Sequence, residues 1–165
     1  MSGRPASTVP ALGRERACRG VACAHDSGRQ EPHPAGSAMM QSMPAGRRIL
    51  VVDDNHDAAD LLAEYLEALG HTTRVAYDGG AALAVADEFQ PDLVMLDIGL
   101  PVMDGYEVAR NLRQRRSSPE LRLVALTGYG QESDRQRALE AGFDAHLVKP
   151  LSVHRLVELL RGMWD

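Results

Sequence analysis

Three aspartates follow apolar segments of the sequence at positions where their carboxylates could do chemistry. Asp53 and Asp54 come directly after the apolar run 49–52, and Asp97 comes directly after the run 93–96. Three carboxylates that lie close together repel one another unless a cation stands among them. A carboxylate can also attack phosphorus as a nucleophile and form an acyl phosphate. These residues indicate cation-assisted phosphoryl transfer, with Asp97 as the acceptor.

A hydroxyl and an ammonium group stand at the ends of two further apolar runs. Thr127 follows the run 121–126, and Lys149 follows the run 145–148. An ammonium group offsets the negative charge of a phosphoryl group during transfer, and a hydroxyl can donate a hydrogen bond to it. We therefore expect Thr127 and Lys149 to complete the site if the fold brings the five side chains together.

The elements that would position these residues can be read from an alternation of apolar runs and helical patterns. Five units of this kind follow residue 47, which is typical of an α/β fold with a parallel sheet. Several runs are continuously apolar, as expected for strands that helices cover on both faces. The predicted strands are 49–52, 72–76, 93–96, 121–126 and 145–148, with helices starting near 57, after 78, after 104, at 133 and near 152.

This alternation predicts a five-stranded, doubly wound parallel sheet with five helices, of the flavodoxin-like type and with strand order 2-1-3-4-5. In such a sheet, ligands bind beyond the carboxyl ends of the strands, where the strand order reverses. The reversal lies between the first and third strands, which end at Asp53 and Asp97. The predicted fold therefore brings the candidate residues to one edge.

Magnesium is the cation that this set of ligands favours. It uses a few carboxylates, keeps several waters and leaves positions for phosphate oxygens. Only His56, among His and Cys residues, adjoins these strand ends, so zinc or copper is poorly supported.

Each residue alone has an ordinary structural explanation. An acidic pair after a strand is usually a solvated turn, a single Asp or Thr at a strand end is usually a helix cap, and a single Lys is usually on the surface. The occurrence of all of them at four strand ends favours a site.

Residues 47–163 resemble the receiver domain of two-component response regulators, a family that includes the chemotaxis regulators. The motifs that carry the resemblance are V-V-D-D-N at 51–55, L-D-I-G-L-P-V-M-D-G at 96–105, A-L-T-G-Y at 125–129 and V-K-P-L at 148–151. The resemblance implies a protein that is not an enzyme but accepts a phosphoryl group from a sensor histidine kinase in a magnesium-dependent reaction.

The resemblance also implies a role for each acidic position. Asp54 would be a direct magnesium ligand, and Asp53 would act more often through water. Asp97 would be both the phosphoacceptor and a ligand, and the backbone carbonyl of Gly99 would be a further ligand. The absence of a side chain at Gly99 removes a group that often influences dephosphorylation in the family.

For the remaining positions, the resemblance implies a switch. Thr127 would sense the phosphoryl group, Lys149 would contact it, and the bond before Pro150 would be cis. His146 stands where the family usually has Tyr or Phe. We expect Thr127 to move toward the phosphoryl group and the His146 ring to turn, which would reshape the face formed by the helix 133–141, the strand 145–148 and the final helix.

Three alternatives share part of this pattern. A haloacid-dehalogenase-type phosphohydrolase also uses Asp and magnesium, but its nucleophile lies in a D-x-D after the first strand, where this sequence has D-D-N at 53–55. A receiver-like module that is never phosphorylated would not need Asp97, Thr127 and Lys149. A phosphorelay intermediate or a phosphate sink for a hybrid kinase fits the residues as well as a single-domain regulator does.

The composition limits the partners and the location. Of the 165 residues, 44% are hydrophobic and 25% charged, which is usual for a soluble globular protein, and no apolar run approaches a membrane span. Residues 47–165 carry 13 basic and 20 acidic residues, so we expect no binding to nucleic acid. The only cysteines are Cys18 and Cys23, so no disulfide framework supports the domain and a cytoplasmic location is expected.

The ends of the chain complete the predicted domain organisation. Residues 1–46 show no helical or strand period, and we expect a disordered extension there, or a translation start that lies among Met39, Met40 and Met43. The receiver domain is expected to span 47–165. Because the chain ends at Asp165, soon after the last helix, we expect a single-domain regulator that acts by binding an unknown protein.

Overall fold

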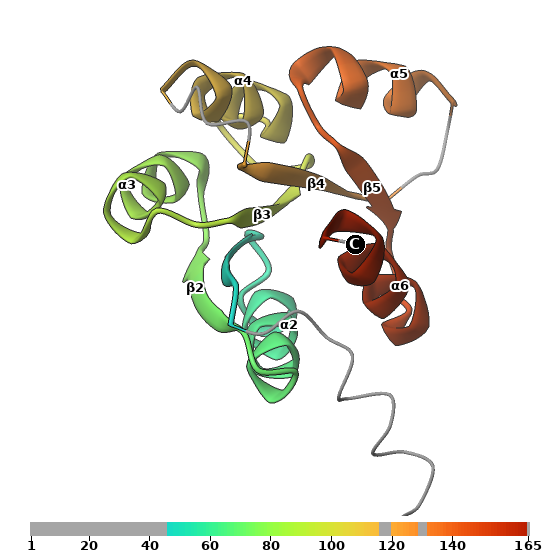
Figure 1. Ribbon diagram of the computed structural model, residues 1–165. Coiled ribbons are helices and arrows are strands. Elements are labelled where there is room, and N and C mark those ends of the chain that lie inside the picture. The colour runs from blue at the N-terminus through green and yellow to red at the C-terminus, as the bar shows by residue number, and fades with distance from the viewer. Residues whose placement is uncertain (1–45, 116–119, 129–131, 165) are drawn as a thin grey trace, which may run out of the picture. The chain divides into compact units, whose positions relative to one another are not determined.

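A computed structural model of the chain describes residues 46–115, 120–128 and 132–164 (Figure 1). The predicted extension 1–46 therefore lies outside the described residues except for Gly46. Strands and helices alternate in the described part: β1 (Arg48–Val52), α2 (His56–Ala68), β2 (Thr72–Ala76), α3 (Gly79–Phe89), β3 (Leu93–Asp97), α4 (Gly105–Arg115), β4 (Arg122–Thr127), α5 (Glu132–Ala141), β5 (Ala145–Val148) and α6 (Val153–Trp164). None of the described helices is long and apolar enough to cross a membrane.

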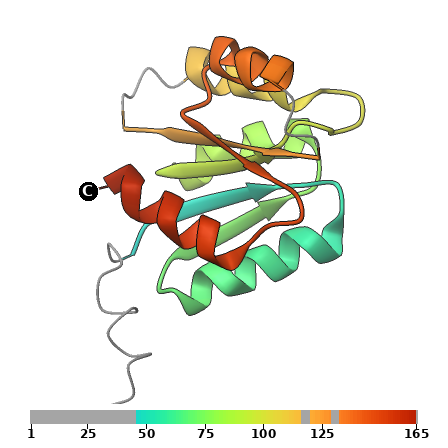
Figure 2. The same ribbon diagram turned by 90° about the vertical axis from the view of Figure 1, so that its right-hand side faces the viewer.

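The five strands form one parallel sheet in the order β2-β1-β3-β4-β5. Helices α2 and α6 cover one face, and α3, α4 and α5 cover the other, as Figures 1 and 2 show. This arrangement confirms the predicted doubly wound, flavodoxin-like sheet with five helices and its strand order. Figure 2 also shows that all strands point toward the same edge of the sheet.

The alternation of side chains along β1 shows why its apolar run is continuous. Leu50 and Val52 are buried against α3 and α4, and Ile49 and Val51 are buried against α2 and α6. Successive side chains of a strand point to opposite faces, so a strand covered on both faces needs apolar residues at every position. The four apolar residues of β1, 49–52, are therefore fully buried.

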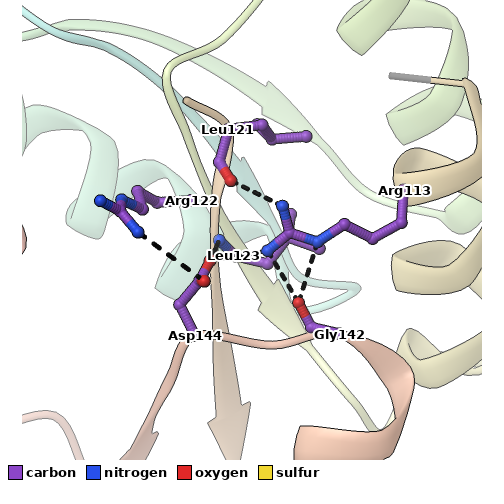
Figure 3. Close-up of polar contacts among 6 residues, drawn as sticks. All are labelled: Arg113, Leu121, Arg122, Leu123, Gly142 and Asp144. Atoms are coloured by element: carbon purple, nitrogen blue, oxygen red, sulfur yellow. Dashed lines mark hydrogen bonds and ion pairs between the residues drawn. The ribbon is translucent and has the colours of Figure 1, made fainter. Parts of the chain in front are cut away.

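Several bounds differ by one residue from the predicted ones: β1 begins at Arg48, β3 ends at Asp97 and α5 begins at Glu132. Helix α2, predicted to start near 57, begins at His56, and Asn55 caps it because its side chain accepts a hydrogen bond from the Ala58 amide at 3.2 Å. Asp57 lies in the first turn, where its charge suits the helix dipole. Strand β4 begins one residue later than predicted, at Arg122, and the carbonyl of Leu121 before it accepts a hydrogen bond from Arg113 of α4 at 2.7 Å (Figure 3).

Candidate functional site

The carboxylates of Asp53, Asp54 and Asp97 come together at the carboxyl edge of the sheet. Strands β1 and β3 are neighbours in which Val52 pairs with Leu96, so the next residue of each strand reaches the same level. One oxygen from each of the three carboxylates lies within 4.8 Å of the others. Asp53 and Asp97 are buried, whereas Asp54 is exposed. The structure thus places the three predicted acidic residues in one cluster.

Backbone amides orient the two buried carboxylates. The amide of Asn55 donates to Oδ1 of Asp53 at 2.9 Å, and the amide of Gly99 donates to Oδ1 of Asp97 at 2.9 Å. Each carboxylate therefore has its Oδ1 held by its own loop, which leaves its Oδ2 for contacts with other side chains of the site.

Lys149 connects the same two carboxylates through its ammonium group. Its Nζ lies 2.6 Å from Oδ2 of Asp53 and 2.9 Å from Oδ2 of Asp97. Burial lowers the pKa of Lys149, but the hydrogen bonds and charges of the two aspartates outweigh that effect, so the pKa is raised above its ordinary value. The ammonium form is therefore the resident state at neutral pH.

The strand ends around Lys149 fix its backbone. The Lys149 amide donates to the Thr127 carbonyl at 2.7 Å, which joins the residue after β5 to the last residue of β4. The peptide bond between Lys149 and Pro150 is cis, as the family resemblance implies.

Thr127 is buried at the end of β4, one residue past Leu126, which pairs with Asp97. Its hydroxyl oxygen has no hydrogen-bond partner among the described residues. A buried hydroxyl without a partner is unfavourable, so such a group usually has a ligand or water to bind. An anion bound at Asp97 would be in the right region of the sheet to accept this hydrogen bond.

The donor set fits magnesium better than a softer metal. Its three clustered ligand groups are carboxylates, which suit a small hard cation that retains several waters. Gly99, whose carbonyl is the further predicted ligand, lies in the loop directly after β3 and is exposed. This loop therefore stands at the cluster.

The loop between β3 and α4 is packed tightly against the acceptor strand. A Cβ atom on Gly105 would lie 2.5 Å from the backbone oxygen of Asp97 and 2.6 Å from Cα of Ile98. In the same loop, Val102 has a φ of 69° and is fully exposed. Positive φ is unfavourable for a β-branched residue, so the loop that follows the acceptor strand holds one strained position.

His146 lies on β5 opposite Ala125 and is half-buried. It lines a cavity of about 310 Å³ between β5 and α6, together with Val148, Arg155 and Leu159 among others. The structure places it near the predicted output face, and its role in switching stays a prediction.

Two residues that support the site were not among the predicted ones. Asn55 holds Asp53 through its amide, and Gly105 allows α4 to approach Asp97. Asn55 could have been found as the first capping residue after the acidic pair. Gly105 could have been found as the glycine of the D-G pair that starts a helix, since only a residue without Cβ fits such a close approach.

The folded part of the chain is similar to a known family and to known proteins. Residues 49–161 match the family described as "Response regulator receiver domain". RpaA of Synechocystis, named a DNA-binding dual master transcriptional regulator, is 35% identical over 116 residues, which are 70% of this chain and 48% of RpaA. A 14.6 kDa protein of Leptolyngbya boryana is 39% identical over 113 residues, or 68% of this chain and 86% of that protein. The chain thus spans about half the length of RpaA but most of the smaller relative.

Solved structures give the same result. The chemotaxis response regulator CheY4 of Vibrio cholerae superposes with a TM-score of 0.68 and 26% identity, covering 72% of this chain and 99% of CheY4. A two-component response regulator of Clostridium difficile superposes with a TM-score of 0.66 and 26% identity. The match covers 71% of this chain and 94% of that protein. The range that matches the family model, 49–161, contains Asp53, Asp54 and Asp97. From this sequence match and this fold, the chain belongs to the response-regulator receiver domain family.

Proposed function

We propose that Asp97 accepts a phosphoryl group from the phosphohistidine of a sensor histidine kinase. The observation that carries this proposal is the geometry of Asp97: it is buried, shares the Lys149 ammonium with Asp53 and lies within the cluster of three carboxylates. Receiver domains are phosphoacceptors rather than enzymes in the usual sense, so family membership sets aside the haloacid-dehalogenase-type hydrolase.

In the proposed reaction, a carboxylate oxygen of Asp97 attacks the phosphorus atom of the phosphohistidine. An O–P bond forms while the N–P bond breaks, and the imidazole leaves with the bonding electron pair and takes up a proton. The product on this chain is an aspartyl phosphate.

Asp53, Asp54 and Asp97, with the carbonyl of Gly99, would hold a magnesium ion, which when bound neutralises charge on the phosphoryl oxygens. Lys149 offsets the negative charge on the acceptor side, and its short contact with Asp97 holds it there. The Thr127 hydroxyl gains its missing partner when it donates to a phosphoryl oxygen. These contacts strengthen as charge builds on the transferring group, which is the condition for catalysis of the transfer.

The signal would leave through the face formed by α5, β5 and α6. Phosphorylation draws Thr127 toward the acceptor, and the half-buried His146 ring on the neighbouring strand turns toward the space that Thr127 leaves. We expect His146→Ala to keep phosphorylation of Asp97 and to remove most of the difference in partner affinity, which for allosteric coupling is typically about 1–3 kcal/mol. An unchanged affinity ratio in this variant would exclude the histidine from the switch.

A groove beside the acceptor suits the kinase as a partner. A cavity of about 510 Å³ runs between α2 and the start of α6, and Asp53 and Lys149 form part of its wall. Leu61 and Val153 line it and are 69% and 55% exposed. Asp57 and Glu64, four residues before and three residues after Leu61 on α2, are exposed acids. The groove therefore fits an apolar helix face of the kinase with basic residues beside it.

The groove can be tested apart from the acceptor. Leu61→Asp should slow phosphotransfer from the cognate kinase and leave labelling by acetyl phosphate unchanged. Leu139→Asp, on the 64% exposed side chain of α5, is the matched control and should leave both rates unchanged. If the kinase transferred phosphate to Leu61→Asp and to the unmodified protein at the same rate, the groove between α2 and α6 would not be its binding site.

The acceptor itself is tested with acetyl phosphate and magnesium. We expect one acid-stable, base-labile phosphoryl group per chain by mass spectrometry, and none in Asp97→Asn. Labelling of Asp97→Asn at the level of the unmodified protein would overturn the proposal.

Other features stay predictions. We also expect a cytoplasmic location and no binding to nucleic acid. The same acceptor chemistry would serve a regulator that binds a target protein, a phosphorelay intermediate or a phosphate sink.

A further inference from the structure

Helix α3 has no polar side chain over most of its length. Residues 79–86 read G-G-A-A-L-A-V-A, and Asp87 is the first charged residue of the helix. A surface helix of a globular protein normally has polar residues on the face away from the core, and a helix that is apolar on all sides is normally buried. We therefore expect another surface to cover the outward face of α3.

The outward face of α3 consists of small residues. Gly80 and Ala84 are exposed, and Ala81 and Val85 are half-buried at the edge of the core. Figure 1 shows α3 beside the edge strand β2, at the end of the sheet away from β5. Packed helix axes lie about 8–10 Å apart, and small side chains permit the shorter distances. A second helix can therefore approach this face closely.

A hollow between α3 and β2 continues this face. It has a volume of about 310 Å³ and is lined by Arg74, Val85, Glu88 and Phe89. The Arg74 guanidinium lies 5.9 Å from the ring centre of Phe89. The hollow thus combines two apolar side chains with one positive and one negative charge.

The two charges of the hollow are not paired with each other. Arg74 and Glu88 are exposed, and in the part of the chain that the structure describes neither side chain forms an ion pair. The neighbouring Asp87, in contrast, pairs with Arg115 of α4 at 2.8 Å. The hollow therefore offers a cation and an anion to whatever covers it.

A second copy of the chain has both complementary charges at the required spacing. In a symmetric dimer, a contact of residue i with residue j of the partner is accompanied by the reverse contact. A two-fold axis through the hollow would set Arg74 of each copy against Glu88 of the partner subunit, with Val85 and Phe89 of both copies between them. The small residues of α3 would let the two helices approach beside this centre.

We propose that the chain forms a symmetric dimer through the outward face of α3 and the hollow beside it. Helix α3 covers the sheet face opposite to α2 and α6, so the dimer leaves the groove between those two helices open in both copies. The 11 residues of α3 span about 16 Å, which makes a small interface. We expect a weak dimer, with a dissociation constant on the order of 100 µM, that forms without phosphorylation of Asp97.

Sedimentation equilibrium of the full chain, from about 10 µM to about 1 mM, tests the dimer. The average mass of the unmodified protein should rise from the 17.9 kDa of one chain toward twice that value. Arg74→Glu and Glu88→Arg should each weaken association about ten-fold, because each turns two attractive contacts of the dimer into repulsive ones. Ala84→Glu puts a long charged side chain on the face and should keep the protein monomeric.

An equal mixture of Arg74→Glu and Glu88→Arg should associate as tightly as the unmodified protein, because both contacts of the mixed dimer then join opposite charges. Misfolded chains could not produce this recovery. Arg155→Glu and Glu158→Arg, which reverse the charges of an exposed ion pair on α6, are the matched controls and should leave association unchanged.

Three results would overturn the proposal. A chain that stays monomeric at about 1 mM would leave a different protein to cover α3. A dimer that the variants of Arg74, Ala84 and Glu88 weaken no more than the controls on α6 do would use another face. A mixture that does not recover the affinity would exclude the reciprocal contacts between Arg74 and Glu88.

Discussion

Lys149 places one ammonium group between two buried carboxylates that would otherwise repel each other. A residue that contacts both Asp53 and the acceptor has two effects, because it holds the free site together and also meets the incoming phosphoryl group. These effects can be separated by measuring metal binding and phosphorylation in the same variant.

We expect Lys149→Met to bind magnesium at least as tightly as the unmodified protein, because it removes a cation that competes for the same carboxylates. Labelling by acetyl phosphate should slow by about 100-fold, the usual effect of removing one stabilising donor from a transfer site. Lys149→Arg keeps the positive charge but replaces the compact ammonium group with a planar guanidinium group. It should recover part of the rate of labelling by acetyl phosphate. Loss of magnesium binding in Lys149→Met would show that the lysine mainly supports the local structure.

Val102 offers a test of backbone strain. Its φ of 69° is unfavourable for a β-branched side chain, and the side chain is fully exposed and packs on nothing. Val102→Gly should raise the free energy of unfolding by about 1 kcal/mol in a urea titration, since relief of strain exceeds the added entropy of the unfolded chain. Val102→Ala should raise the free energy of unfolding by less than Val102→Gly does. A loss of stability in the glycine variant would mean that the valine makes a contact that matters.

For the side chains of the site, the sequence predicts which of them meet but not how they are held. Asp53, Asp97, Thr127 and Lys149 each end an apolar run, and parallel strands bring such positions to one edge whatever the loops do. The bridge made by Lys149 and the unpartnered hydroxyl of Thr127 depend on side-chain rotamers and on burial. Those properties arise from packing among distant segments, so no local pattern reveals them.

Helix α4 packs tightly against the acceptor strand, because its first residue, Gly105, lies against the backbone of Asp97. Gly105→Ala would put a Cβ atom against backbone atoms, which cannot move aside as a flexible side chain can. We expect it to lower the free energy of unfolding by about 1–3 kcal/mol and to slow labelling of Asp97.

Gly162→Ala is the matched control for this substitution. Gly162 lies in α6, and a Cβ atom added there would meet no other atom within 4 Å, so alanine should stabilise the helix by about 0.5–1 kcal/mol. If both alanines had the same effect, the close approach of α4 to β3 would not constrain the fold.

Helix ends show where prediction at the element scale succeeds and where it does not. Asp78 and Asp104 accept hydrogen bonds from amides three residues later, as their positions before helical patterns suggest. For α2, Asp57 and Asn55 are both good caps, and the choice of Asn55 depends on the turn that Asp53 forms with the Asn55 amide. The hydrogen bond from Arg113 of α4 to Asp144 was not predictable, because the two residues are 31 positions apart in the chain.

Across the whole molecule, the edge of the sheet opposite the site carries a different kind of buried polar group. His71, before β2, is buried, and neither of its ring nitrogens has a hydrogen-bond partner among the described residues. Burial lowers its pKa, and the positive charge of Arg47 lowers it further. The folded protein therefore holds this histidine neutral.

This histidine predicts how stability depends on pH. Because its pKa in the folded protein lies below the ordinary value of 6.5, the unfolded chain binds more protons as the pH falls through that value. The contribution to stability is present above pH 6.5 and is lost as the pH decreases below it. Urea titrations at a series of pH values measure the free energy of unfolding. As the pH falls below 6.5, this free energy should decrease less in His71→Phe than in the unmodified protein.

The exposed His154 provides the control, since its 74% exposed side chain meets only Glu158 on its own helix among the described residues. In His154→Gln, the free energy of unfolding should decrease with falling pH as much as in the unmodified protein. If it decreased equally in His71→Phe, the pH dependence would arise from the carboxylates instead.

Lys149 has one more property, which the sequence as a whole determines: it is the only lysine, and the other 17 basic residues among the 18 are arginines. Apart from the α-amino group, the protein has a single primary amine, and that amine lies in the reaction centre. An amine-selective acylating reagent would therefore modify two sites, the α-amino group and Lys149, and peptide mapping of the Lys149 adduct would report on this centre. Its rate should be slow while Asp53 and Asp97 hold the ammonium form, and any ligand that changes these contacts should change the rate. The acylation rate of Lys149 would thus measure whether a ligand is bound at the site.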